Sequence, residues 1–220
     1  MTSSKKIILW FLVLGPFIGL FSLVQLTSMG FFGDLPTFEQ LENPKNNLAT
    51  EVISEDGVVL GKYFFENRSR VRYDELPENL INALIATEDV RFREHSGIDG
   101  RALLRAIFGA VTGKSSSGGA STITQQLAKM LFTDQPGSGI DRLMQKLKEW
   151  VIAAQLEKRY TKDEILSMYL NRFDWVNNAV GIKSASKVYF NKKPFELDIE
   201  EAAMLVGMLK NPALYNPNRR

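Results

Sequence analysis

The strongest constraint on this chain is an uncharged, apolar run of 27 residues at positions 7–33. About 20 helical residues suffice to cross a hydrocarbon core of roughly 30 Å, so the run predicts one membrane-spanning helix. A cleavable signal peptide would have a shorter apolar core, of roughly 7 to 15 residues, and a small-residue cleavage site. We therefore predict an uncleaved transmembrane anchor over residues 7–33.

The charges that flank this run predict its orientation. Lys5 and Lys6 precede it, whereas Asp34 and Glu39 follow it. Because positive charge is retained on the cytoplasmic side, residues 1–6 should form a short cytoplasmic N-terminus. The rest of the chain is then expected on the outer, or periplasmic, face of the cytoplasmic (inner) membrane.

Composition excludes several classes of function. Hydrophobic residues make up 45% of the 220, which is enough for one packed domain. The formal net charge is only +2 and no basic stripe is visible, so we expect no nucleic-acid partner. The chain has no cysteine, which excludes disulfides and cysteine-based zinc sites.

The pattern after the anchor predicts a mainly α domain. Residues 34–48 are rich in proline and asparagine and should form a linker. Asp56 and Gly57 then separate two β-prone runs, a strong signal for a hairpin. After Pro77 the periodicity is helical to the end, so we assign residues 49–220 to one mainly α domain with a short N-terminal β-hairpin.

A carboxylate interrupts the apolar face of the first of these helices. If residues 79–95 are helical, Glu88 lies on the same face as Leu84 and Phe92. Desolvation there would disfavour an ionised carboxylate and make it a usable general base near neutral pH. The alternative is a surface Glu88 paired with Arg91, and periodicity does not decide between the two.

The segment that follows has the pattern of a membrane-surface helix. Leu104 and Phe108 alternate with Arg101 and Arg105, and a Ser/Gly run follows at positions 113–119. A basic, apolar helix of this kind can lie among lipid headgroups. An ordinary amphipathic core helix with a surface loop fits the same pattern.

Three further groups of polar residues have both structural and functional interpretations. Thr122 and Gln125 predict a capping box, and the N-terminus of that helix could also bind phosphate or sugar groups. Two cations and a carboxylate, Arg142, Lys146 and Glu149, share a face of the helix expected over about 140–160. They fit either a solvated ion-pair surface or a site for a diphosphate and a metal ion. In a later short helix, Tyr169 and Asn171 are suited to buried hydrogen bonds.

The order and spacing of these groups resemble the peptidoglycan glycosyltransferase family, found as the N-terminal module of class A penicillin-binding proteins and as monofunctional enzymes. The first family motif is matched by Glu88, Asp89, Phe92, His95 and Gly97. The second is matched by Gly119, Ser121, Thr122, Gln125 and Gln126. The third is matched by Lys146 and Glu149, with Gln145 where the family has arginine, and the fourth by Lys162, Ile165, Leu166, Tyr169 and Asn171.

Two departures from the family pattern stand out. Arg142, one turn before Lys146, is the candidate to replace the arginine lost at Gln145. The fifth family motif is an Arg-Arg pair followed by apolar residues, and we interpret Arg219 and Arg220 as part of a loop instead. The domain at 49–220 is therefore expected to be C-terminally truncated.

The resemblance implies a fold with a lysozyme-like lobe and a small membrane-associated lobe. It also implies an activity, the polymerisation of lipid II into β-1,4-linked glycan strands with inversion and release of undecaprenyl diphosphate. It implies that Glu88 is the catalytic base and that Glu149 is catalytic and binds a divalent cation, Mg²⁺ or Mn²⁺, with no nucleotide or organic cofactor. The implied substrate-binding residues are Asp89, Phe92, His95, Arg105, Gly119, Ser121, Thr122, Gln125, Gln126, Lys129, Arg142 and Lys146. The implied structural residues are Lys162, Tyr169 and Asn171.

The implied partners are lipid II, the growing glycan strand, the cytoplasmic membrane, and other proteins of cell-wall synthesis and division. Two alternatives are a lytic transglycosylase, which would cleave glycan strands, and a non-catalytic membrane-anchored scaffold.

Overall fold

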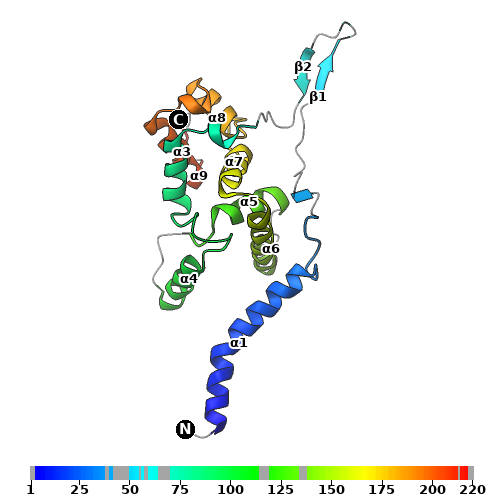
Figure 1. Cartoon of the computed structure of the whole chain (residues 1–220), viewed down its shortest axis with the longest axis vertical. Helices are drawn as coiled ribbons and strands as arrows, with labels where there is room; N and C mark the ends of the chain where they lie inside the picture. Colours follow the sequence, from blue (N-terminus) through cyan, green and yellow to red (C-terminus); the bar gives the residue numbers. More distant parts are fainter. Residues whose placement is uncertain are drawn as a thin grey trace.

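The computed structural model shows a mainly helical protein, as predicted (Figure 1). It describes residues 3–37, 40–41, 50–54, 56, 59–63, 70–113, 119–133, 138–212 and 214–217. The α-helices are α1 (Ser3–Ser28), α3 (Glu78–Glu88), α4 (Gly100–Thr112), α5 (Ile123–Phe132), α6 (Gly139–Arg159), α7 (Lys162–Arg172), α8 (Ile182–Phe190) and α9 (Ile199–Lys210). The strands are β1 (Thr50–Ile53) and β2 (Val59–Tyr63), and short 3₁₀ helices are η1 (Tyr73–Glu75) and η2 (Pro194–Glu196).

Side-chain caps determine where the helices around the site begin. Asp99, Thr122 and Thr161 precede α4, α5 and α7, and each accepts a hydrogen bond from the backbone N–H three residues further on (3.0, 3.1 and 3.3 Å). Such a cap satisfies one of the N–H groups that the first turn leaves unpaired. These three helix starts are therefore encoded locally.

The core forms where α3, α5, α6, α7 and α9 meet. α5 packs between α6 and α7, and α3 packs against α9 (Figure 1). The largest buried side chain is Trp175, whose Nε1 donates to the carbonyl of Leu205 in α9 (3.0 Å). The other large, fully buried side chains include Tyr169, Phe92, Leu80, Leu84, Ile123, Leu127, Ile152 and Leu156.

The N-terminal segments extend away from this core. β1 and β2 pair antiparallel, with Thr50 opposite Tyr63 and an irregularity after Val52 (Figure 1). The predicted linker at 34–48, in the part that the structure describes, is not detached from the domain. Leu41 is fully buried, and its carbonyl accepts a hydrogen bond from the Tyr160 hydroxyl (2.6 Å).

α1 corresponds to the predicted anchor but is shorter than the uncharged run. It ends at Ser28, because Gly30 and Gly33 adopt positive φ angles (80° and 106°) that a helix does not accommodate. α1 packs against α6 and then runs away from the body (Figure 1). In the described part of the chain, no helix combines the length and the apolar character that crossing a bilayer requires.

The helix predicted over residues 79–95 ends at Glu88, so that prediction was wrong beyond this residue. Asp89 leaves the helical conformation (φ −158°, ψ 77°) and directs its carboxylate at α5, where it accepts from the N–H of Ile123 (3.2 Å). Glu88 is therefore the last residue of α3 and half-buried, rather than part of a continuous apolar stripe with Phe92 and His95.

The loop between α7 and α8 contains a strained residue. Val176, Asn177 and Asn178 all have positive φ angles (57°, 51° and 59°). Asparagine tolerates this left-handed region, whereas a β-branched side chain is an outlier there. Val176 therefore destabilises the native loop.

We expect Val176→Asn to raise the free energy of unfolding by about 1 kcal/mol, because strain of this kind costs of order 1–3 kcal/mol per residue. Thermal unfolding followed by circular dichroism measures the change. Val188→Asn is the matched control, since Val188 is similarly exposed but lies in α8 with ordinary geometry. A melting temperature that rises equally in both variants, or in neither, contradicts the strain argument.

Candidate active site

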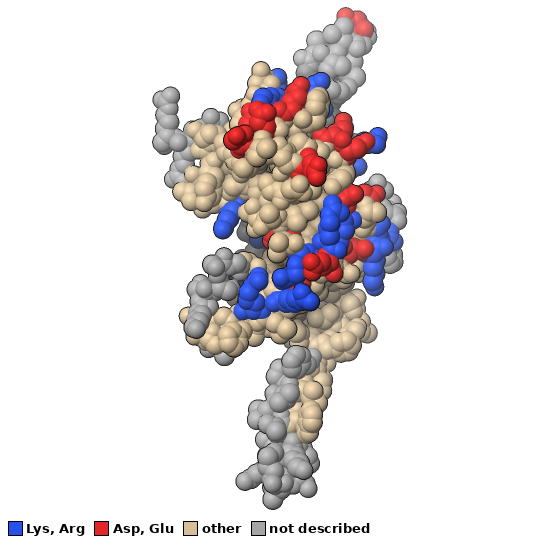
Figure 2. All heavy atoms as spheres, turned by 60° about the vertical axis from the view of Figure 1, so that its left-hand side comes forward, with Lys and Arg blue, Asp and Glu red and all other residues tan. Residues whose placement is uncertain are grey.

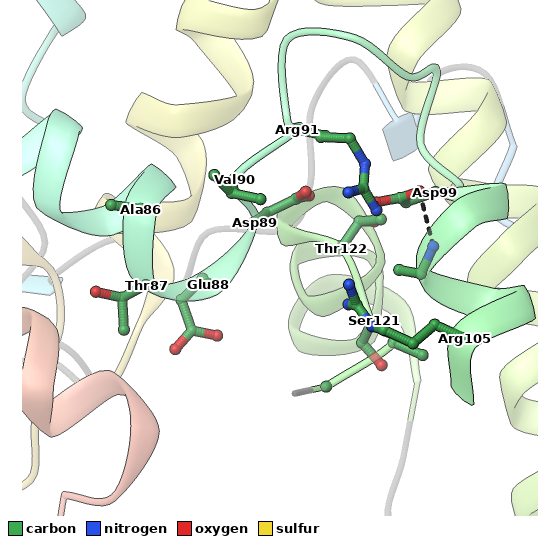
Figure 3. A pocket seen from close by; sticks show the side chains of 13 residues that line it. Ala86, Thr87, Glu88, Asp89, Val90, Arg91, Asp99, Arg105, Ser121 and Thr122 are labelled. Atoms are coloured by element: carbon green, nitrogen blue, oxygen red, sulfur yellow. Dashed lines mark hydrogen bonds and ion pairs between the residues drawn. The ribbon is translucent and has the colours of Figure 1, made fainter. Parts of the chain in front are cut away.

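A pocket opens between the end of α3, the start of α4 and the segment before α5. Glu88 lies on one side, and Arg105 reaches in from α4 on the other (Figure 3). The predicted site residues that line this pocket are Glu88, Asp89, Arg105, Gly119, Ser121 and Thr122. The first and second motifs, far apart in the sequence, are thus brought together.

Glu88 is held by an amide rather than by a cation. Gln126 Nε2 donates to Glu88 Oε2 (2.8 Å). The predicted alternative, a surface pair with Arg91, is wrong, because the Arg91 guanidinium donates to Asp99 instead (2.5 Å). A carboxylate at the C-terminus of a helix also faces the negative end of the helix dipole, which disfavours it. Glu88 is therefore placed at some cost to stability, as functional side chains often are.

The rest of the first motif is buried and contacts the protein itself. His95 Nε2 lies 3.0 Å from Asp89 Oδ2, and both side chains are more than nine-tenths buried. Phe92 is completely buried, and Lys162 Nζ lies 4.3 Å from the centre of its ring. Because Phe92 has no exposed surface, its predicted contact with substrate is not available in this structure. This part of the motif forms the wall behind Glu88.

A buried ion pair closes the α4 side of the pocket. Burial alone would raise the pKa of Asp99, but hydrogen bonds from the Ala102 N–H and the Arg91 guanidinium outweigh it and hold the pKa below its usual value. Asp99 therefore stays ionised as the cap of α4. This pairing occupies a carboxylate that would otherwise be available to a substrate.

The second motif joins α5 to the loop after His95. Thr122 caps α5 as predicted, but the capping box is only half formed, because the Gln125 side chain turns to the carbonyl of Gly97 (3.2 Å). The Thr122 hydroxyl donates to the same carbonyl (2.7 Å). Thr122 and Gln125 are buried, so their described hydrogen bonds are structural ones.

The third motif reaches the pocket through Ser121. Lys146 Nζ donates to Ser121 Oγ (2.7 Å) and to Glu149 Oε2 (3.0 Å). Lys146 keeps about a third of its side chain exposed (35%), whereas Glu149 keeps 7%. α6 thus adds an accessible cation, backed by a buried carboxylate, to the Ser121 side of the pocket.

Glu149 is the residue predicted to bind a divalent cation. Among the described residues, no group of three or more His, Cys, Asp and Glu side chains could hold a metal ion. Mg²⁺ is commonly held by one or two carboxylates together with substrate phosphates and water. Among the described residues, Glu149 therefore does not belong to an all-protein metal site.

The fourth motif ties the walls together. Lys162 Nζ donates to the carbonyl of His95 (2.6 Å) and to Glu157 (2.8 Å). Asn171 bonds both backbone groups of Val71, accepting from its N–H (2.9 Å) and donating to its carbonyl (2.7 Å). α7 thereby holds the segment before η1 and the loop that carries the first motif.

Comparisons with known proteins identify the family of the chain. Residues 56–220 match the family model described as transglycosylase. The chain belongs to the peptidoglycan glycosyltransferase family.

Several relatives are penicillin-binding proteins 1A. That of Neisseria flavescens is 36% identical over 215 residues, which are 97% of this chain and 26% of the relative. That of Neisseria gonorrhoeae is 37% identical over 195 residues, which are 89% of this chain and 24% of the relative. That of Pseudomonas aeruginosa is 36% identical over 183 residues, which are 83% of this chain and 22% of the relative. The chain spans about a quarter of the length of the curated relatives it matches.

The departure from the family's third motif has a local explanation. Gln145 Nε2 donates to the hydroxyl of Thr133 at the end of α5 (3.0 Å), so it joins α6 to α5. Its predicted substitute, Arg142, is exposed on α6, and Lys129 is exposed on α5. Neither of these two cations is among the residues that line the pocket.

Some residues that shape the site were not predicted as site residues. The sequence does contain a signal for Asp99, since an aspartate before Gly100 and an apolar run is typical of a helix N-cap. Glu157 carries no such signal. It accepts from Thr124 (2.5 Å) and Lys162 (2.8 Å), and only the packing of α5 against α6 and α7 brings these groups together.

We expect Gly97→Ala to lower the free energy of unfolding by about 1–3 kcal/mol, as strained positions of this kind do. Gly97 has a φ of 88°, and an added Cβ would lie 3.0 Å from the backbone of Ala153 in α6. Chemical denaturation measures the loss. The control is Gly100→Ala, because no atom lies within 4 Å of a Cβ added there. Equal stability of the two variants would show that α6 moves aside freely.

Proposed function

We propose that this member of the family polymerises lipid II, the undecaprenyl-diphosphate-linked disaccharide-pentapeptide, in bacterial cell-wall synthesis. The products are β-1,4-linked glycan strands of inverted configuration and undecaprenyl diphosphate. The observation that carries the proposal is the pocket itself, in which Glu88, bonded to the neutral amide of Gln126, lies across from Arg105 and Ser121.

The proposed reaction needs one base and no second carboxylic acid. Glu88 takes the proton from the acceptor 4-hydroxyl as its oxygen attacks the anomeric carbon of the donor, and the bond from that carbon to the diphosphate breaks. A diphosphate leaves as an anion and needs electrostatic help more than a proton. The other pocket carboxylates, Asp89 and Asp99, are engaged with His95 and Arg91, which supports this assignment.

The donor diphosphate is proposed to bind on the opposite side. Arg105, Ser121 and Lys146 supply cations and a hydroxyl for its oxygens. Glu149 orients Lys146 and would hold a divalent cation that arrives with the diphosphate and neutralises part of its charge. Lys and Arg side chains gather beside a hollow on the face drawn in Figure 2, which favours an anionic ligand.

α4 is proposed to lie in the membrane interface as part of a small membrane-associated lobe beside a lysozyme-like one. Its large apolar residues face solvent: Leu104, Ile107 and Phe108 are 63%, 51% and 69% exposed. Exposed apolar groups on a basic helix are typical of interfacial helices. We propose that α1 attaches the protein to the inner membrane, since it extends from the same end of the molecule as α4 (Figure 1) and exposes Phe21.

This arrangement places the pocket next to the leaflet that carries a polyprenyl-linked donor. The proposed partners are therefore lipid II, the growing strand and the membrane. The proposed location is the outer or periplasmic face of the inner membrane, where other cell-wall synthesis and division proteins work.

We expect Glu88→Gln to reduce polymer formation by about 10²–10⁴-fold, the usual contribution of a general base. The assay incubates detergent-solubilised protein with labelled lipid II and a divalent cation. Glu94→Gln is the control, because Glu94 is exposed in the same loop and should keep wild-type activity. Polymerisation by Glu88→Gln at the wild-type rate would refute the base assignment. Shortening of preformed glycan by the wild type would indicate a lytic enzyme. If the wild type gives no reaction at all, the protein is a scaffold.

We expect a tryptophan placed on α4 to be quenched by lipid. The Phe108→Trp variant, reconstituted in vesicles with brominated acyl chains, should lose more fluorescence than wild type does, because the side chain reaches the acyl boundary. Phe195→Trp is the control, since Phe195 is similarly exposed (59%) but lies on η2. Equal quenching of both variants would contradict the interfacial position of α4.

A further inference from the structure

Glu88 is connected to the buried core through one amide side chain. Gln126 Nε2 donates to Glu88 Oε2 (2.8 Å), and the Tyr169 hydroxyl donates to Gln126 Oε1 (3.0 Å). The three residues come from α3, α5 and α7. They form a line of hydrogen bonds that begins in the core and ends at the pocket.

The effect of this line on Glu88 depends on how the Gln126 amide is turned. A carboxamide donates from its nitrogen and accepts at its oxygen. With the nitrogen toward Glu88, the amide stabilises the ionised carboxylate. Turned by 180°, it would present its oxygen and favour the protonated carboxyl, which can donate. The orientation of Gln126 therefore decides whether Glu88 meets a hydrogen-bond donor or an acceptor.

Tyr169 favours the first of these orientations. Its side chain is completely buried, and an amide turned the other way would take away the acceptor of its O–H group, which is costly in a core. Burial, and secondarily the negative charge of Glu88, raise the pKa of the Tyr169 phenol far above its usual range. The phenol therefore remains a donor at every pH at which an enzyme of this kind works.

We propose that Tyr169 is a positioning residue for the general base. By holding the Gln126 amide with its nitrogen toward the pocket, it presents a hydrogen-bond donor to the Glu88 carboxylate and keeps that carboxylate directed at the acceptor hydroxyl. This inference rests on the proposed function, in which Glu88 is that base. It gives the fourth motif a part in the chemistry as well as in the fold.

Other ionisable groups around Glu88 bear on its titration as well. Asp89 lies against His95, Asp99 is paired with Arg91, and Arg105 lies across the pocket. None of these hydrogen bonds involves Gln126 or Tyr169. A change at Tyr169 can therefore be separated from changes in the rest of the pocket.

A hydroxyl that only satisfies the core would behave differently from a positioning residue. Its removal would lower the stability of the protein and leave the pH dependence of the reaction unchanged. The two roles can thus be distinguished by a pH profile together with an unfolding measurement.

The experiment measures kcat and KM for polymerisation of lipid II against pH in wild type, Tyr169→Phe and Tyr189→Phe. In Tyr169→Phe we expect the acidic limb of kcat to move to higher pH by about one unit, as the loss of one orienting hydrogen bond should produce. KM should change by less than about twofold, because Tyr169 is too buried to touch substrate. At high pH, kcat should recover toward the wild-type value.

Tyr189→Phe is the matched control. The Tyr189 hydroxyl also bonds a core group, the carbonyl of Trp175 (2.6 Å), but it is not connected to Glu88. This variant should lose stability without moving the acidic limb. An unmoved limb in Tyr169→Phe, or an equal movement in both variants, would overturn the proposal.

A second variant tests whether Tyr169 acts on Glu88 through Gln126. Gln126→Met removes the amide, so adding Tyr169→Phe to it should produce no further movement of the limb if Tyr169 acts through Gln126. If the two substitutions move the acidic limb additively, Tyr169 does not act through Gln126. Glu88→Gln separates this inference from the base assignment on which it rests. If Glu88→Gln keeps full activity, the base assignment fails. If it is inactive but the acidic limb of Tyr169→Phe does not move, only the proposed role of Tyr169 fails.

Discussion

The carboxylate of Asp89 is the contact on which the rest of the site depends. It accepts from the N–H of Ile123 at the start of α5 and lies against the ring of His95. A negative group is favourable at the N-terminus of a helix, because it meets unpaired N–H groups and the positive end of the dipole. This contact ends α3 at Glu88 and leaves that residue at the rim of the pocket instead of inside a longer helix.

The family motifs of this chain are therefore mostly a scaffold. Thr122, Gln125 and Phe92 are buried and bond or pack against other parts of the protein. The motif residues that remain open to a ligand are few, chiefly Glu88 on one side of the pocket and Ser121 with Lys146 on the other. A motif of this kind identifies the family reliably because it encodes the walls of the site together with the reacting groups.

Local features of the sequence were enough to predict much of the fold. The helix starts at Thr122 and Thr161 depend on side chains within three residues, so a short window contains the whole cause. The end of α3 could not be predicted in this way. Its cause is an N–H group 34 residues further along the chain, and the three-and-four spacing of apolar residues continues past Glu88 as if the helix did too.

The same distinction applies to the site. Spacing along α6 placed Lys146 and Glu149 on one face, and the structure shows them bonded to each other. Spacing could not show that Lys146 also bonds Ser121, or that Tyr169 bonds Gln126, 43 residues away. Such contacts depend on how α5 packs between α6 and α7.

The distribution of charge explains why Glu88, among several carboxylates, suits the role of base. Asp99, Glu149 and Glu157 each accept from a cationic side chain: Arg91, Lys146 and Lys162. A carboxylate bonded to a cation gains little by taking a proton, because protonation would break the pair and leave the cation without its partner. Glu88 bonds a neutral amide in the described part of the chain. Protonation of Glu88 would therefore break no described ion pair, which supports its proposed role as the base.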